Sequence, residues 1–212
     1  MRYKFAVMKM DYSFFRNDLL TKGAILGGVM LASSVAETWL FYKGGTEWLL
    51  PLSVEFLVSM ALYIFLIYRF TKSHSNNVVE LREQMPYFTY GEGLLYAMNV
   101  SGLAGIVVGV GNYLFMHYAV GYEEFINAYI KLFQDFLSQV QLLPRDIDMI
   151  EQIFEELQKS EEPSLLSSIL SYVTRYIMTG AFVGLVVAAF TKRTPWNNTT
   201  NINNGNEPNN EQ

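Results

Sequence analysis

The sequence contains no cysteine. This excludes disulfide frameworks, thiolate metal sites and cysteine nucleophiles. Charged residues are also scarce: Asp, Glu, Lys and Arg make up 17% of the chain, whereas they make up about 25% of an average soluble domain. Hydrophobic residues reach 51%. This balance favours one small membrane domain over soluble domains.

The motifs of several common enzyme classes are missing as well. The sequence has no HExxH zinc motif, no GxSxG nucleophile elbow and no glycine-rich phosphate-binding loop followed by Lys and Ser or Thr. Its two histidines, His74 and His117, fall on opposite sides of the membrane in the topology predicted below, which excludes a joint site. We therefore expect a non-enzymatic protein with no metal, no cofactor and no nucleic-acid partner.

Long apolar runs are present instead. A helix needs about 20 mostly apolar residues to cross about 30 Å of hydrocarbon, and continuous runs favour helices over the alternating pattern of barrel strands. The predicted fold is an all-α integral membrane protein with four transmembrane helices and an extracytoplasmic helical segment between the third and fourth. The predicted spans are residues 23–42, 49–68, 94–120 and 165–190.

The basic residues predict the orientation of these spans, because Lys and Arg near span ends are retained in the cytoplasm. Ten of them lie before the first span, between the second and third, or after the fourth, and four lie in the other two connections. Both termini are therefore predicted to be cytoplasmic.

Two segments flank the predicted membrane domain, which covers residues 23–190. Residues 1–22 form a cytoplasmic lead-in of mixed basic and aromatic character, for which an interfacial helix and an ordinary approach to the first span are both open. Residues 191–212 are rich in Asn and nearly free of aliphatic side chains. They cannot bury enough surface to fold, and we expect a disordered cytoplasmic tail.

The connection between the third and fourth spans, residues 121–164, is acidic. Its residues 123–162 contain ten acidic residues and three basic ones. Apolar residues recur at helical spacing on both sides of Pro144, which predicts two amphipathic helices that form an extracytoplasmic cap. The charges are most simply a solvated face, while a cation site and a partner-docking surface stay open.

Polar residues at a common depth interrupt the apolar spans. Glu37, Glu55, Asn112 and Arg175 agree in depth to within about two helical turns, and His117 lies slightly nearer the outer surface. A lone charge at the bilayer centre costs about 2.5 to 3.5 kcal/mol. We therefore predict a buried polar cluster of these five residues in which Arg175 pairs with both carboxylates.

The role of this cluster is open at the level of sequence. One carboxylate remains in excess, and an uncompensated buried carboxyl tends to take up a proton, so a proton or cation site is one interpretation. The other is structural, because a polar cluster inside a small bundle fixes which helix packs against which.

Glycines predict close contacts between the spans. Three of the spans contain the small-xxx-small spacing that lets helix backbones approach. The pattern serves packing within one chain as well as between copies. The glycines concerned are Gly23, Gly27, Gly105, Gly109, Gly180 and Gly184.

Three stretches carry a family resemblance: YFTYGEGLL before the third span, the glycine-rich middle of that span, and the run from EEPSLLSSIL to GAFVGLVVAAFTKR. With the four spans, residues 15–194 resemble the bacterial inner-membrane proteins catalogued as domain of unknown function 4199. The resemblance implies a multi-pass location in the bacterial inner membrane. It implies no activity, and no residue roles are carried over from it.

Three classes of function are compatible with these features. The predicted one is a non-enzymatic accessory or scaffold protein, and the alternative is a small oligomeric transporter or a proton- or cation-coupled carrier that uses the Glu and Arg cluster. An intramembrane enzyme has the least support among the residues. The expected partners are the lipid bilayer and either another membrane protein or further copies of the chain.

Overall fold

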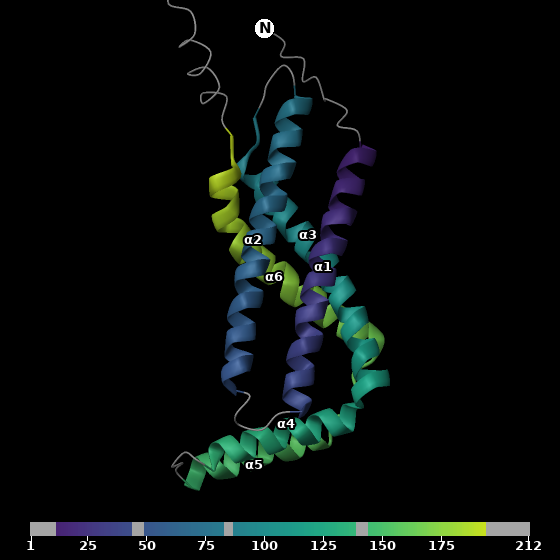
Figure 1. Ribbon diagram of the computed structural model, residues 1–212, viewed down its shortest axis with the longest axis vertical. Helices are drawn as coiled ribbons and strands as arrows, with labels where there is room; N and C mark the ends of the chain where they lie inside the picture. Colours follow the sequence, from purple (N-terminus) through teal and green to yellow (C-terminus); the bar gives the residue numbers. More distant parts are fainter. Residues whose placement is uncertain (1–11, 44–48, 83–86, 139–143, 194–212) are drawn as a thin grey trace, which may run out of the picture.

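The computed structural model describes residues 12–43, 49–82, 87–138 and 144–193, and these ranges are helical except for short connections such as residues 87–89 and 159–164 (Figure 1). They contain no strand beyond an isolated bridge between Phe88 and Arg193, which confirms the all-α fold class. The elements are α1 (Tyr12–Lys43), α2 (Leu49–Leu81), α3 (Tyr90–Phe115), the π-helix η2 (Met116–Val120), α4 (Tyr122–Leu137), α5 (Pro144–Gln158) and α6 (Leu165–Thr191).

Four of these helices are long and apolar enough to cross a membrane, which confirms the predicted number of spans. The apolar stretches are Phe15–Tyr42, Leu50–Leu81, Tyr90–Val120 and Leu165–Thr191. Two helices extend beyond their predicted spans. Residues 12–22 begin α1 and form no separate interfacial helix, and α2 continues to Leu81 because Thr71, His74 and Ser75 in its last turns are buried by their neighbours. Residues 1–11 and the predicted disordered tail from 194 onward lie outside the described residues.

The two ends of the bundle differ in construction. The beginning of α1 and the end of α6 lie at the same end, whereas α4 and α5 lie across the opposite end (Figure 1). Four membrane crossings place the first and last helical residues on one side of a membrane. The side that is cytoplasmic stays a prediction.

Helix α3 is the centre of the bundle and packs most extensively against α6 and α1. Glycines allow these close approaches. A Cβ atom at Gly105 would lie 2.8 Å from Cα of Val173, and one at Gly109 would lie 2.9 Å from Cα of Ile169, so the backbones of α3 and α6 touch.

The remaining predicted glycines also lie at helix contacts within one chain. Gly23 and Gly27 of α1 face Leu103 and Val107 of α3. Gly180 of α6 faces Ser101, and Gly184 faces Ala97 and Leu94, all on α3. The structure therefore places every one of the six glycines against a neighbouring span.

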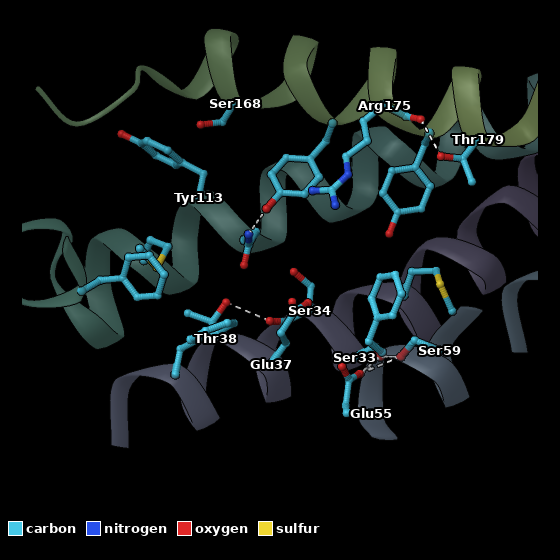
Figure 2. A pocket seen from close by; sticks show the side chains of 18 of the residues that line it. Ser33, Ser34, Glu37, Thr38, Glu55, Ser59, Tyr113, Ser168, Arg175 and Thr179 are labelled. Atoms are coloured by element: carbon cyan, nitrogen blue, oxygen red, sulfur yellow. Dashed lines mark hydrogen bonds between the residues drawn. The ribbon is translucent and has the colours of Figure 1, made fainter. Parts of the chain in front are cut away.

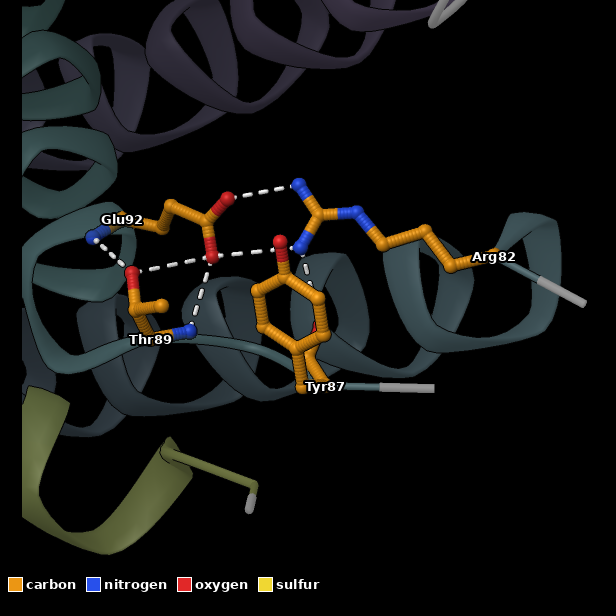
Figure 3. A network of polar contacts seen from close by, with 4 residues as sticks. All are labelled: Arg82, Tyr87, Thr89 and Glu92. Carbon is orange, nitrogen blue, oxygen red and sulfur yellow. Dashed lines mark hydrogen bonds and ion pairs between the residues drawn. The ribbon is translucent and has the colours of Figure 1, made fainter. Parts of the chain in front are cut away.

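A network of hydrogen bonds and an ion pair stabilises the end of the bundle where the described chain begins and ends (Figure 3). Thr89 and Glu92 form a capping box at the start of α3. Arg82, just after α2, donates from Nη2 to Oε1 of Glu92 at 2.6 Å and from Nη1 to the carbonyl oxygen of Tyr87 at 2.9 Å. The network joins α2 to α3.

The predicted amphipathic helices of the acidic connection are α4 and α5. Pro144 is the first residue of α5, the position where proline fits a helix best. Helix α4 packs against α1, with the rings of Tyr129 and Phe41 6.0 Å apart. The helices are as predicted, while their extracytoplasmic location stays a prediction.

Candidate functional site

A cavity of about 620 Å³ lies within the four spans, in the half of the bundle next to α4 (Figure 2). We call it the membrane pocket. Glu37 of α1, Glu55 of α2, Asn112 of α3 and Arg175 of α6 all line it. The structure therefore brings together four of the five residues of the predicted polar layer, one from each span.

Glu55 is held by serines of two helices. Ser59, one turn further along α2, donates from Oγ to Oε1 of Glu55 at 2.6 Å, and Ser33 of α1 donates to the same oxygen. Ser33 and Ser59 also contact each other. A carboxylate in the second span is thus stabilised by hydroxyl donors and links α1 to α2.

Arg175 does not make the predicted pairs. Among the described residues, no ion pair joins it to Glu37 or Glu55. Its side chain extends from α6 into the membrane pocket toward α1 (Figure 2). The prediction of paired charges is wrong because α6 packs against α3 through Gly105 and Gly109, which leaves the pocket between α6 and the α1–α2 pair.

The predicted burial of the cluster also needs correction. Asn112 is buried, Glu37 and Glu55 are half-buried, and Arg175 and His117 are exposed. Glu37 interacts electrostatically with both Glu55 and Arg175, but within the described ranges no hydrogen bond or ion pair engages its carboxylate. The cluster lines an open pocket and does not form a closed core.

Asn112 leaves an acceptor free in the membrane pocket. Its Nδ2 donates to the hydroxyl of Tyr172 on α6. Its Oδ1 is buried and has no hydrogen-bond partner among the residues that the structure describes. A buried amide oxygen is normally satisfied, so this one is available to a donor that enters the pocket.

His117 lies at the rim of the membrane pocket and does not line it. Its Nδ1 is 3.0 Å from Oε1 of Glu162, which together with Pro163 lines the pocket. The hydroxyl of Tyr122 contacts Oγ of Ser160 at 2.9 Å. These contacts hold the connection between α5 and α6 against the pocket.

The π-helix η2 continues α3 beside the membrane pocket, and its first residue, Met116, lines the pocket. The residue that follows it, Gly121, has a φ of 89°, a conformation that glycine adopts without strain. Single π-helical turns inside α-helices are frequent at functional sites. Sequence gives no signal for this turn.

A polar network around Asp18, at the end of the bundle away from the membrane pocket, was not predicted. Asp18 of α1 accepts from Nζ of Lys22 at 2.7 Å, contacts Nδ1 of His74 at 3.0 Å and accepts from the hydroxyl of Tyr96 at 2.8 Å. The His74 and Tyr96 rings stack with their centroids 3.9 Å apart. Asp18 and Lys22 have the i, i+4 spacing of an ion pair on one helix. This spacing is the one feature of the sequence that could have indicated the network.

Comparison with known proteins gives a family and nothing more specific. The family described as "Protein of unknown function (DUF4199)" matches residues 21–193. No curated protein and no solved structure matches the chain. The matched range covers most of the first span, the other three spans, the acidic connection, the membrane pocket and most of the Asp18 network. The chain therefore belongs to this family of proteins of unknown function.

Proposed function

We propose that this protein binds a small solute in the membrane pocket and acts as a carrier-type, non-enzymatic membrane protein. The observation that carries the proposal is that three polar groups of the pocket are left without a hydrogen-bond or ion-pair partner among the described residues. Polar clusters that serve only to fix helix packing satisfy one another. Here the guanidinium of Arg175, the carboxylate of Glu37 and Oδ1 of Asn112 face shared space without partners among the described residues.

The form of the pocket supports the same proposal. Its volume of about 620 Å³ falls within the roughly 300 to 1,000 Å³ of small-molecule sites. At its inner end Tyr63 contacts Oγ of Ser101 at 2.7 Å. Beyond Tyr63 the side chains of Leu26, Ile67 and Val100 are fully buried. A site near the middle of the membrane that is closed toward one side is the arrangement that alternating access uses.

The location of the protein is part of this proposal. The basic residues and the family resemblance favour a bacterial inner membrane with cytoplasmic termini. In that orientation the membrane pocket, which adjoins α4, faces the extracytoplasmic side. Solute would enter there, and release to the cytoplasm would require the buried layer beyond Tyr63 to open.

A scaffold function is the second candidate, and α4 and α5 favour it. Large apolar side chains of both helices are exposed, with Phe136 at 44%, Met149 at 57% and Ile153 at 48%. Exposed apolar stripes of this kind dock on a partner or on the membrane surface. This function needs no accessible pocket, so accessibility of the pocket separates the two candidates.

Thiol labelling tests whether water and solute reach the membrane pocket. The chain has no cysteine, so Ser34→Cys, which lines the pocket, supplies a single thiol. We expect a charged, membrane-impermeant thiol reagent to label it from the extracytoplasmic side, since the reactive thiolate forms in water and is disfavoured in apolar surroundings. Labelling is read by mass spectrometry in right-side-out vesicles.

The matched control is Ala36→Cys, two residues further along α1 and exposed outside the pocket. It faces lipid in the proposed arrangement and should react at least about tenfold more slowly, because its thiolate is disfavoured there. Equal and negligible labelling of both variants would contradict a water-filled pocket. Labelling of Ser34→Cys from the cytoplasmic side alone would reverse the orientation.

A further inference from the structure

The membrane pocket presents opposite charges from opposite sides. Arg175 comes from α6, and Glu37 and Glu55 come from α1 and α2 (Figure 2). In the described part of the chain these charges form no ion pair with one another. A guanidinium is suited to bidentate recognition of a phosphate or carboxylate, and a carboxylate receives an ammonium group.

A ligand with a single charge fits this arrangement poorly. Three carboxylates, those of Glu37, Glu55 and Glu162, and one guanidinium line the pocket. Acidic groups are therefore in excess, and a simple anion at Arg175 is repelled by Glu37 and Glu55. A simple cation at Glu37 leaves the guanidinium of Arg175 without an anionic partner. A ligand that carries both charges satisfies both sides.

Asn112 and Glu55 further define the cationic half of the ligand. The free Oδ1 of Asn112 can only accept hydrogen bonds, and an ammonium group offers three donors. Among the described residues, the hydroxyls of Ser33 and Ser59 donate to Oε1 of Glu55, and Oε2 has no donor. The pocket therefore offers acceptors that a primary ammonium can use and a quaternary one cannot.

Apolar side chains also line the membrane pocket, among hydroxyl-bearing ones. Met30, Phe41, Phe56, Met60 and Phe125 line the same cavity. Methionine and aromatic side chains suit the packing of a flexible apolar group. A small zwitterion alone would leave this surface uncovered.

We infer that the membrane pocket recognises an amphiphilic zwitterion, in which a primary ammonium group is joined to a phosphate or carboxylate group and to an apolar portion. This inference rests on the proposed function and specifies its ligand. The same chemistry occurs in the headgroup of a lipid and in a free solute. Arg175 holds the anionic group, and Glu37, Oε2 of Glu55 and Oδ1 of Asn112 hold the ammonium group.

Thermal unfolding of the full chain in an uncharged detergent tests this inference, because a ligand that binds the folded state raises the melting temperature. The soluble probes are phosphoethanolamine, ethanolamine and inorganic phosphate. The lipid probes are short-chain phosphatidylethanolamine, phosphatidylcholine and phosphatidylglycerol. We expect stabilisation by phosphatidylethanolamine, and more weakly by phosphoethanolamine, at concentrations at least about tenfold below those of the other four.

The relative potency of the two ammonium zwitterions identifies the source. A lower half-maximal concentration for phosphatidylethanolamine supports the inference and identifies a lipid headgroup. A lower one for phosphoethanolamine, which has no apolar portion, overturns the inference in favour of a small free zwitterion. Equal stabilisation by ethanolamine alone or by phosphate alone overturns it in favour of a simple cation or anion site, and so does a lack of response to every probe.

Charge-neutralising variants test which pocket residues bind the two charged groups of the ligand. Glu37→Gln and Arg175→Gln are each expected to weaken binding of the active probe about tenfold to a hundredfold. The matched controls are Glu155→Gln and Lys159→Gln, which neutralise an exposed ion pair on and just after α5 and should leave binding unchanged. Arg175→Lys replaces Arg175→Gln if the latter does not fold. Equal effects of pocket and control variants overturn the assignment.

The inference and the proposed function fail in different ways. If Ser34→Cys is labelled from water but no zwitterion stabilises the protein, the pocket is a solute site for another class of ligand. If Ser34→Cys is not labelled and no probe binds, the proposed function fails together with the inference.

Discussion

Replacing Asp18 by alanine is expected to lower the free energy of unfolding by about 3 kcal/mol, the cost of breaking a buried ion pair by removing one partner. The side chains of Asp18 and Lys22 are only 11% and 13% exposed. Without Asp18, the Lys22 ammonium keeps weak contacts at 3.5 Å to the carbonyl oxygen of Phe70 and at 3.3 Å to Oγ of Ser73, and lies 5.7 Å from the centroid of the Tyr96 ring. Denaturant unfolding in detergent, followed by circular dichroism, measures the loss.

Two further variants test whether the loss of unfolding free energy depends on the burial of the ion pair and on the charge left at Lys22. Glu155 and Lys159 form an ion pair of the same i, i+4 spacing but are 70% and 75% exposed, so Glu155→Ala should cost less than about 0.5 kcal/mol. Adding Lys22→Met to Asp18→Ala should recover part of the loss by removing the uncompensated charge. If Asp18→Ala costs no more than Glu155→Ala, the network has no role in stability.

Replacing Gly105 by leucine is expected to abolish most of the folded yield. A Cβ atom there would lie 2.8 Å from Cα of Val173 and 2.9 Å from the carbonyl oxygen of Tyr172. These are backbone atoms, which cannot rotate away as a side chain can. Helix α6 would have to move off α3, which costs at least about 3 kcal/mol, the upper part of the usual range for overpacking. Size-exclusion chromatography of the purified protein measures the monodisperse fraction.

The matched control for this steric argument is Gly28→Leu on α1. A Cβ atom at Gly28 meets no atom within 4 Å, so leucine there points into lipid and should fold like the unchanged protein. Comparable losses for both variants would mean that the chain tolerates leucine poorly at glycines in general. The contact between α3 and α6 would then not be the cause.

The spans and the common depth of the polar residues could be predicted from sequence because both depend on distance along one helix. Length and hydropathy identify a span, and a fixed rise per residue places Glu37, Glu55, Asn112 and Arg175 at similar levels. The glycine spacings identify helix faces for the same reason. These inferences need no knowledge of the other helices.

The pairing within the polar layer could not be predicted, because it depends on separation across the membrane. Equal depth says nothing about how far α6 stands from α1, and the structure separates them by the membrane pocket. The Asp18 network was missed for a related reason. Asp18 and His74 lie in the polar flanks of the apolar runs, 56 residues apart, and only the extension of α2 beyond its predicted span brings them into contact.

A double-mutant cycle between Glu37→Gln and Arg175→Gln in the ligand-free protein tests most directly that the charges of the membrane pocket are free for a ligand. The cycle measures the coupling between the two residues from the free energies of unfolding of the two single variants, the double variant and the unchanged protein. Residues without a direct contact are expected to couple by less than about 0.5 kcal/mol. A coupling of about 2 kcal/mol or more would show that Glu37 and Arg175 pair with each other, and would contradict a pocket that keeps them for a ligand.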